Sequence, residues 1–346
     1  MDRSSADAFV YAKASGMLAK SFVGPRAASL FAVNSLHELW SLVFQTEVPV
    51  IPEMLLAEKI EQEAEAAFLN DYISLLNNYS RPQSLLVNLL RFYDYDNLKD
   101  IGASLCTANL TGEIPVLPHL AKIGQYSMLN YEAWPDLKLI TSGSTVEWYN
   151  DVPDFSKQQE LDTKLDLQYI RELWDSALHL KGGARQPVLD LLQEEIVMHN
   201  IVWALRLRVY YDMDAEEIYP SFVTVKPLEN LREIKKDPLA GPAVKILSLP
   251  TDSYAEWSTW KYASLLNPNE EGVVWNVDPR WIQQAAKVAI QKKALRQFHR
   301  YPFTPHVLFC WFKIKQYELD CIRTAAEGLR LEVSKEQAKD FAGIVS

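Results

Sequence analysis

The sequence predicts an all-α protein made of three similar helical bundles. Three segments of the chain repeat one order of helices, and glycine is scarce, with 12 residues in a chain of 346. Scarce glycine disfavours a loop-rich β fold. The best strand candidates, residues 222–225 and 273–275, are short enough to be edge pieces at most. We therefore expect helical lobes at residues 1–112, 113–225 and 226–346, arranged about a pseudo-threefold axis.

Each repeat opens with a short helix. In residues 35–44 and 253–260 this helix begins with the pattern S-x-x-E. Such a capping box predicts that the serine and glutamate side chains accept backbone amides that the helix start leaves unbonded. The matching segment of the second repeat, residues 134–140, lacks the box and is the weakest of the three.

The second part of each repeat is a long amphipathic helix with a proline or an acidic residue at its start. These helices are expected to begin at Pro52, near Asp162 and at Asp278. In the first, an acidic face (residues 58–65) lies opposite the apolar stripe and is expected to be solvated. The predicted stripes are Leu56, Ile60, Ala64, Ala67, Leu75 and Tyr79; Leu165, Tyr169, Leu173 and Leu178; and Trp281, Ala285, Val288, Leu295 and Phe298.

The third part is a closing helix, aligned by placing Asp94, Val197 and Glu318 at one position. Offsets of −8, −1, +3 and +4 from this position fall on one helical face. The residues at offsets −8, −1, +3 and +4, in that order, are Leu86, Leu189 and Cys310; Tyr93, Ile196 and Tyr317; Asn97, Asn200 and Cys321; and Leu98, Ile201 and Ile322.

The repeat length of roughly 100 to 120 residues is too long for a solenoid unit.

Composition excludes several classes of function. The formal net charge of −10 disfavours nucleic acid as a partner, and it disfavours direct adsorption to anionic lipid. No signal peptide and no apolar run of about 20 residues is visible, so direct insertion into lipid is not expected. The three cysteines (Cys106, Cys310 and Cys321) lack C-x-x-C spacing, and we expect them to be reduced in a cytoplasmic protein.

Motifs of catalysis are absent from the sequence. It contains no G-x-x-x-x-G-K-[ST], G-x-G-x-x-G, G-x-S-x-G or H-E-x-x-H. No catalytic residue, cofactor or metal ligand is therefore expected. Two weaker signals remain as alternatives. Glu195 and His199 could ligate a metal from one helix face, although a surface hydrogen-bonding pair is favoured. Asp94, Asp96 and Asp100 faintly suggest the Mg²⁺-diphosphate motif of all-helical prenyl-transfer enzymes, although a scaffold role is favoured.

Two groups of residues are candidates for contact with a partner protein. Six large aromatic rings lie within residues 298–312, more than one small bundle needs for its core. Basic side chains near them and on the second closing helix could meet partner carboxylates. The candidate interface residues are Arg206, Arg208, Phe309, Trp311, Phe312, Lys313 and Arg323.

Several segments together resemble one known family. Residues 11–17 (YAKASGM) are similar to its opening helix, and residues 161–169 (LDTKLDLQY) to its second long helix. Its three closing motifs are matched by residues 93–99 (YDYDNLK), 200–206 (NIVWALR) and 315–323 (KQYELDCIR). The chain thus resembles the rotor subunit called C in bacterial and archaeal V/A-type ATPases and d in the eukaryotic vacuolar enzyme. It departs from the family pattern at Val197, Gln316 and Cys321.

The resemblance implies a function without catalysis. In that family three helical lobes form a funnel-shaped piece on the cytoplasmic face of the membrane proteolipid ring, held there through protein partners. The piece receives the central shaft and transmits torque between the ring and the head that handles ATP. The resemblance therefore implies two partners, the ring and the shaft. Two alternatives stay open: a Mg²⁺-dependent prenyl-transfer-like enzyme, and a helical-repeat adaptor unrelated to an ATPase.

Overall fold

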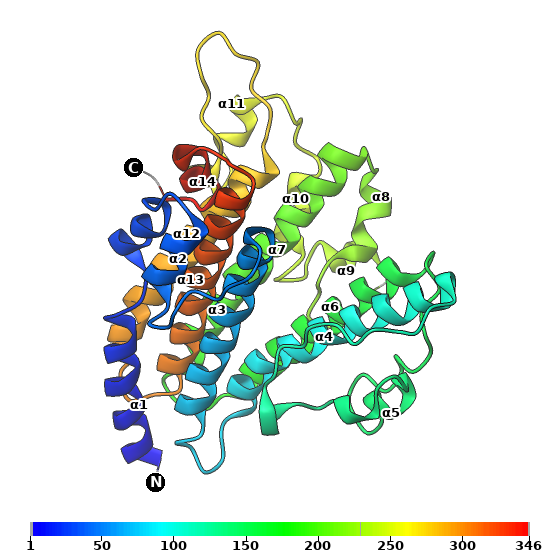
Figure 1. Cartoon of the computed structure of the whole chain (residues 1–346). Helices are drawn as coiled ribbons and strands as arrows, with labels where there is room; N and C mark the ends of the chain where they lie inside the picture. The colour runs from blue at the N-terminus through cyan, green and yellow to red at the C-terminus, as the bar shows by residue number, and fades with distance from the viewer. Residues whose placement is uncertain (1–2, 229, 345–346) are drawn as a thin grey trace. The chain divides into compact units, whose positions relative to one another are not determined.

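The computed structural model describes residues 3–228 and 230–344, and every regular element in those ranges is a helix (Figure 1). The predicted all-α fold class is therefore confirmed. The chain divides into two compact units. Unit one consists chiefly of residues 65–180, and unit two of residues 4–64 together with the chain from residue 181 onward. The first boundary falls inside a long helix, between Ala64 and Glu65.

The six longest helices are the predicted long and closing helices. The three long helices are α3 (Glu53–Leu76), α6 (Gln158–Leu178) and α12 (Pro279–Arg300). The three closing helices are α4 (Ser84–Thr111), α7 (Arg185–Tyr211) and α13 (His306–Arg330). The other α-helices are α1 (Arg3–Leu18), α2 (Leu36–Val43), α5 (Leu137–Thr141), α8 (Ala215–Ile218), α9 (Leu231–Ile234), α10 (Gly241–Ile246), α11 (Tyr254–Trp257) and α14 (Lys335–Phe341). Short 3-10 helices are η1 (Gly24–Phe31), η2 (Gly124–Tyr126), η3 (Tyr131–Ala133), η4 (Tyr219–Ser221) and η5 (Ala263–Leu265).

Unit one is built on the pairing of α4 with α6. Apolar residues of α4, from Tyr95 to Leu105, form a core with Leu165 of α6 and with the segment that contains α5. α4 ends where Gly112 adopts a left-handed conformation (φ 72°) and its amide donates to the carbonyl of Ala108 at 2.8 Å. Glycine favours this backbone region because it has no Cβ.

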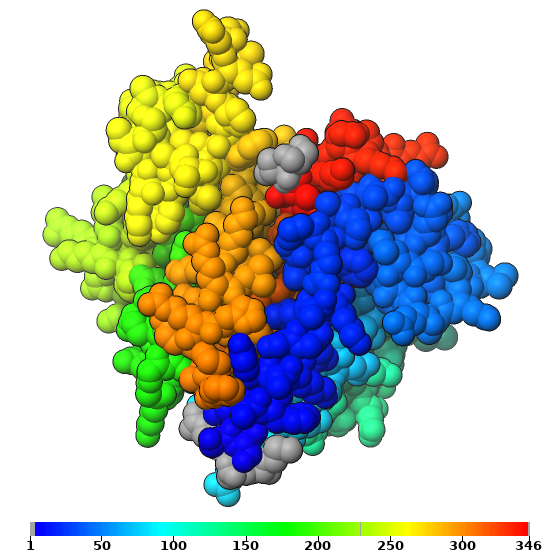
Figure 2. All heavy atoms as spheres, turned by 90° about the vertical axis from the view of Figure 1, so that its left-hand side faces the viewer, coloured from blue at the N-terminus to red at the C-terminus, as the bar shows by residue number. Residues whose placement is uncertain are grey.

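Unit two is centred on α12, which packs along both α13 and α7. The N-terminal helix α1 lies against the far end of α12, where the Tyr11 ring stands 5.6 Å from Phe298. Figure 2 shows α1 (blue) beside α12 (orange) on one face of the molecule. α13 also contacts η1, α2 and α14. α13 carries the most continuous buried run of the chain, because every residue from His306 to Ile314 is buried.

The predicted short helices form, but their caps differ. Ser35 Oγ accepts the amide of Glu38 as the capping box requires, whereas the Glu38 carboxylate reaches back to the amide of Asn34. At the start of α11 the box is absent, and that prediction is wrong. There the Ser253 carbonyl, not its side chain, accepts the Glu256 amide at 3.2 Å. α5 starts at a side-chain cap from Asp136 that was not predicted.

Three predicted stripe positions are also wrong. Tyr79 lies beyond the end of α3, which is Leu76. Ala67 of α3 and Trp281 of α12 are exposed. On α12 the buried residues include Ile282, Ala286 and Phe298, so the start of the stripe lies one residue beyond the predicted position. The burial of Pro279, the first residue of α12, fixes the helix so that Trp281 turns outward.

The aligned face of the closing helices is confirmed. Of the fifteen aligned residues, fourteen are buried, and Tyr317 alone is partly exposed. Asn97 and Asn200 also make equivalent bonds. The Asn97 side chain binds both the amide and the carbonyl of Ala121, each at 2.8 Å. Asn200 binds both backbone atoms of Val223, each at 2.9 Å. The first two repeats therefore share a polar tether that fixes the segment after the closing helix.

The third repeat uses a different segment of the chain. Glu318, aligned with Asp94, accepts the backbone amide of Phe22 in the segment between α1 and η1. Asp94 instead accepts the amide of Met128, which follows it in sequence. The N-terminal segment thus contributes to the third closing helix within unit two. The three lobe ranges, their pseudo-threefold axis and the funnel shape stay predictions.

Candidate partner-binding surface

The three aromatic rings of the predicted interface lie in the core. Phe309, Trp311 and Phe312 are each 0% exposed in unit two. Among the six aromatic residues of the 298–312 segment, Phe303 is exposed, at 57%. The structure thus places these three side chains where they stabilise α13 by packing, because their apolar area is removed from water by the chain itself. The excess of rings that suggested a surface is used to bury both sides of α13.

Lys313 is also part of the interior. Its ammonium group pairs with the Glu195 carboxylate at 2.8 Å, which joins α13 to α7. The lysine side chain is 7% exposed, and that of Glu195 is 33% exposed. Glu195 is therefore engaged by a cation of its own chain, and its partner in the metal-site alternative, His199, is exposed. The pair is a structural link between two closing helices.

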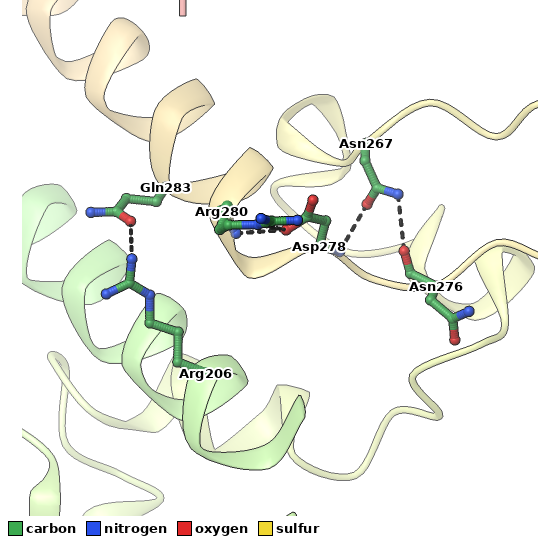
Figure 3. Close-up of polar contacts among 6 residues, drawn as sticks. All are labelled: Arg206, Asn267, Asn276, Asp278, Arg280 and Gln283. Carbon is green, nitrogen blue, oxygen red and sulfur yellow. Dashed lines mark hydrogen bonds and ion pairs between the residues drawn. The ribbon is translucent and has the colours of Figure 1, made fainter. Parts of the chain in front are cut away.

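The three arginines predicted to contact a partner make contacts within unit two. Arg206 Nη2 donates to Gln283 Oε1 at 2.5 Å and so connects α7 to α12 (Figure 3). Arg208 Nη1 donates to the Leu249 carbonyl at 2.6 Å, beyond the end of α10. Arg323 lies 4.0 Å from the Glu61 carboxylate. These contacts give each arginine a role within the fold, and contact with a partner stays a prediction for them.

An exposed apolar surface lies where α7 ends and α12 begins. Here a groove of about 360 Å³ is lined by the last turn of α7, the loop that precedes α12, and Arg280. The loop, residues 268–274, projects from unit two and is exposed along its whole length (Figures 1 and 2). The large apolar side chains exposed on these elements are Val209 (38%), Tyr210 (49%), Tyr211 (71%), Val273 (62%), Val274 (80%) and Trp281 (46%).

The base of this loop is fixed, although its tip is exposed. Asn267 Oδ1 accepts the amide of Asp278 at 3.1 Å, and Asn267 Nδ2 donates to the Asn276 carbonyl at 2.9 Å (Figure 3). The buried Trp275 indole donates to the Asn267 carbonyl at 3.2 Å. One asparagine therefore clamps both ends of the loop. A loop with a clamped base presents its tip in a defined direction and loses less conformational entropy when it binds.

The groove has the character of a protein contact. Its charged side chains are Glu270, Asp278 and Arg280. Asp278 caps α12 through the Arg280 amide at 2.8 Å, and the Arg280 side chain lies 3.5 Å from the same carboxylate. Valine and tyrosine exposed beside a few polar groups are typical of protein interfaces. We refer to the groove and the 268–274 loop together as the α7–α12 surface.

The aspartates behind the prenyl-transfer alternative serve the scaffold. Asp94 is 0% exposed and accepts hydrogen bonds from the Ser127 hydroxyl, the Met128 amide and the Tyr131 hydroxyl, each at 2.7 Å. Burial raises the pKa of Asp94, and these three donors act in the opposite direction. Asp96 and Asp100 are exposed, and Asp96 lies 3.9 Å from Lys99. The buried Asp94 and the two exposed aspartates therefore do not converge on one cavity.

A histidine and a cysteine that the sequence did not single out as a pair are buried together in α13. His306 Nε2 lies 3.2 Å from Cys310 Sγ, one helical turn away, and both residues are 0% exposed. Burial lowers the pKa of His306 to about 4 and raises the pKa of the Cys310 thiol. A neutral imidazole beside a protonated thiol without access to solvent does not form a nucleophilic pair.

Among the described residues, no three His, Cys, Asp or Glu side chains group in a way that could hold a metal ion. The three cysteines are free and buried.

No helix in residues 3–228 or 230–344 is both long enough and apolar enough to cross a bilayer.

The fold and the surface define a class of protein: an all-helical protein with an exposed apolar surface that suits contact with another protein. The comparisons identify the family. The family described as ATP synthase (C/AC39) subunit matches residues 50–341, so the chain belongs to the C/d subunit family of V/A-type ATPases. A protein of Treponema pallidum (strain Nichols), named only as uncharacterized, is 30% identical over 347 residues. That alignment covers 99% of this chain and 98% of the relative.

Proposed function

We propose that this chain is a non-catalytic rotor subunit of a V/A-type ATPase or ATP synthase, which couples the central shaft to the membrane proteolipid ring. The observation that carries the proposal is the family match, which spans residues 50–341 and so includes all six long and closing helices. The subunit family itself is non-catalytic. The chain would work at the cytoplasmic face of the membrane, held by its protein partners.

The architecture of unit two suits the transmission of torque. A coupling piece must resist bending, and closely packed helices transmit strain because their interiors are dense. Polar links between helices add to this stiffness: Lys313 with Glu195 joins α13 to α7, and Arg206 with Gln283 joins α7 to α12. Lys287 and Asp320, 2.6 Å apart, join α12 to α13. Relative sliding of these three helices would break all three links.

The α7–α12 surface is the place where we propose that one of the two partners docks. Its exposed valines and tyrosines would be covered, which removes apolar area from water. The clamp of Asn267 holds the loop in position before binding. Replacing Val273 and Val274 by serine removes the apolar tip and leaves the clamp in place. This variant should fold like the wild type and bind its partner more weakly.

The test of the proposed function is recovery of partners from membranes. A tagged chain expressed in its own cells, or in a related bacterium with a V/A-type enzyme, is purified from detergent-solubilised membranes. We expect proteolipid and shaft subunits in the eluate at ratios that survive a second purification step. Recovery of neither would contradict the proposal, and recovery of a defined partner complex without ATPase subunits would favour the helical adaptor. The purified chain alone should hydrolyse no ATP.

The prenyl-transfer alternative loses its main support in the structure. It requires carboxylates that converge on a cavity and hold Mg²⁺ against a diphosphate. The Asp94 carboxylate instead accepts hydrogen bonds from three donors of its own chain. Incubation with Mg²⁺ and an allylic diphosphate should give no product. Measured turnover would reopen that alternative.

A further inference from the structure

The charge on α12 is the reverse of the charge on the whole chain. The chain has 45 Asp and Glu against 35 Lys and Arg. α12 has none of the acidic residues and six of the basic ones in its 22 residues. A helix with basic residues alone gains no opposite-charge pairs along its own length, so its cations pair with neighbouring elements or remain in water, where a partner can reach them.

Half of the six basic side chains are used by neighbours in unit two. Arg280 lies beside Asp278, at 3.5 Å. Lys287 pairs with Asp320 of α13 at 2.6 Å, and Lys293 pairs with Glu194 of α7 at 2.5 Å. The two lysine pairs face the helices that α12 packs against, α13 and α7. Arg280 differs, because its side chain is 70% exposed and its partner is the N-cap residue of α12 itself.

The other three basic side chains lie on the outer face. Lys292, Arg296 and Arg300 are exposed and recur every four residues, so they form a stripe about 12 Å long on one side of the helix. Within the described part of the chain, no ion pair involves any of the three. Figure 2 shows that part of α12 (orange) is open to solvent beside α1 (blue). We call these residues the α12 basic stripe.

We propose that the α12 basic stripe is a docking site for an acidic helix of a protein partner. Carboxylates at every fourth residue of a helix have the same spacing as the stripe, so a helix that lies along α12 could pair with all three cations. An anionic membrane is the less suitable occupant, because the chain as a whole carries a charge of −10 and would be repelled by it. The charge sign, spacing and length of the site select the partner.

This inference rests on the proposed function, because the partner would be a subunit of the same ATPase. It adds what the family match does not give: the residues that make the contact and the charge of the surface they meet. The stripe lies near the opposite end of α12 from the α7–α12 surface, since Arg280 and Arg300 are about 30 Å apart along the helix axis. One helix would then serve two contacts.

The experiment compares two variants with the same change in charge. K292E/R296E/R300E reverses the stripe. R232E/K235E/K236E reverses three exposed basic residues elsewhere in unit two and is the control. Each protein is titrated with detergent-solubilised proteolipid ring and with the detached head that carries the shaft. Vesicles of phosphatidylglycerol test the lipid alternative. Circular dichroism confirms that both variants fold.

We expect the stripe variant to bind one of the two sub-complexes at least tenfold more weakly than the wild type, and the control to stay within about twofold. Wild-type binding to that sub-complex should weaken steeply with salt, and neither protein should bind the vesicles. Equal binding by the wild type and the stripe variant overturns the inference alone. Equal weakening by the control, or wild-type binding to the vesicles that the stripe variant loses, also overturns it. A wild type that binds neither sub-complex overturns the proposed function as well.

A second measurement identifies the acidic helix. A carbodiimide joins a lysine amine to a carboxylate as an amide with loss of water, so it reports only groups in direct contact. Applied to the assembled enzyme, it should join Lys292 to an Asp or Glu of a ring or shaft subunit, which mass spectrometry locates. The absence of any cross-link from Lys292, while lysines elsewhere in the complex react, would contradict the contact.

Discussion

Asn97 and Asn200 make the same contact in different parts of the chain: each binds both the amide and the carbonyl of one buried residue that follows its helix. The distances are 2.8 Å to Ala121 and 2.9 Å to Val223. Both asparagines sit three positions after the aligned residues Asp94 and Val197. This shared contact is the structural equivalent of the sequence repeat. In both places the asparagine side chain supplies hydrogen bonds to buried backbone groups that lie outside any regular helix.

The first prediction concerns Asn200. Its replacement by alanine leaves the amide and carbonyl of Val223 and the carbonyl of Leu239 without their side-chain partner in a buried place. We expect the free energy of unfolding to fall by about 2–4 kcal/mol. Denaturant unfolding measures the loss. Asn276→Ala, which removes an exposed side chain, is the control and should change stability by less than about 0.5 kcal/mol.

The link between Lys313 and Glu195 should respond unequally to loss of its two members. Glu195→Gln leaves an ammonium group that is 7% exposed without its counter-charge, and we expect a cost of about 3 kcal/mol or more. Lys313→Met leaves a carboxylate that is 33% exposed and regains water, so the cost should be smaller. Thermal and denaturant unfolding of both variants measure the difference. Equal losses would mean that water reaches Lys313 more freely than the structure shows.

Two tryptophans separate core from surface. Trp311 is 0% exposed and Trp281 is 46% exposed. Trp311→Asp places a charge in the core and should cost about 4 kcal/mol or more, enough to prevent stable folding of unit two. Trp281→Asp should leave stability nearly unchanged. Protease resistance and circular dichroism distinguish the outcomes, and a stable Trp311→Asp variant would be inconsistent with the packing of α13.

The stability of the protein should decrease in acid partly because of His306. Burial lowers the pKa of this residue from 6.5 to about 4, so the unfolded chain binds its proton more readily than the folded chain. The contribution is fully present above pH 6.5 and is lost as the pH falls through about 4, with a total of about 3 kcal/mol. His306→Gln does not titrate and should flatten this part of the pH profile. An unchanged slope between pH 6.5 and 4 would contradict the assignment.

Much of the fold could be predicted from the sequence because helical periodicity is a local signal. The starts of α3 and α12 follow from the pairs Pro52-Glu53 and Asp278-Pro279, since proline and a capping acid define a helix start. The buried face of the closing helices was predicted correctly, because a pattern shared by three aligned helices depends little on an exception in any one of them. The error at Trp281 has the same origin: the stripe was counted from a large apolar residue, although Pro279 already fixed which side of α12 is buried.

The proposed binding surface was harder to predict from the sequence than the fold. Aromatic clustering drew attention to residues 309–312, but a helix buried on both sides also needs many rings, and burial is a tertiary property. The exposed tip of the 268–274 loop does carry a signal, because the run P-N-E-E-G precedes Val273 and indicates a turn. The clamp by Asn267 could not be foreseen, since it depends on the two ends of the loop meeting. The basic bias of α12 was visible in the sequence alone.

The position of the chain in the intact enzyme is the most direct test of the central claim. Electron cryo-microscopy of the V/A-type ATPase purified through this chain gives that position. The account predicts density for these helices between the proteolipid ring and the foot of the central shaft, present once per complex and rotating with them among the rotary states. Density on the stationary part of the complex, or a complete ring-and-shaft assembly without this chain, would contradict it.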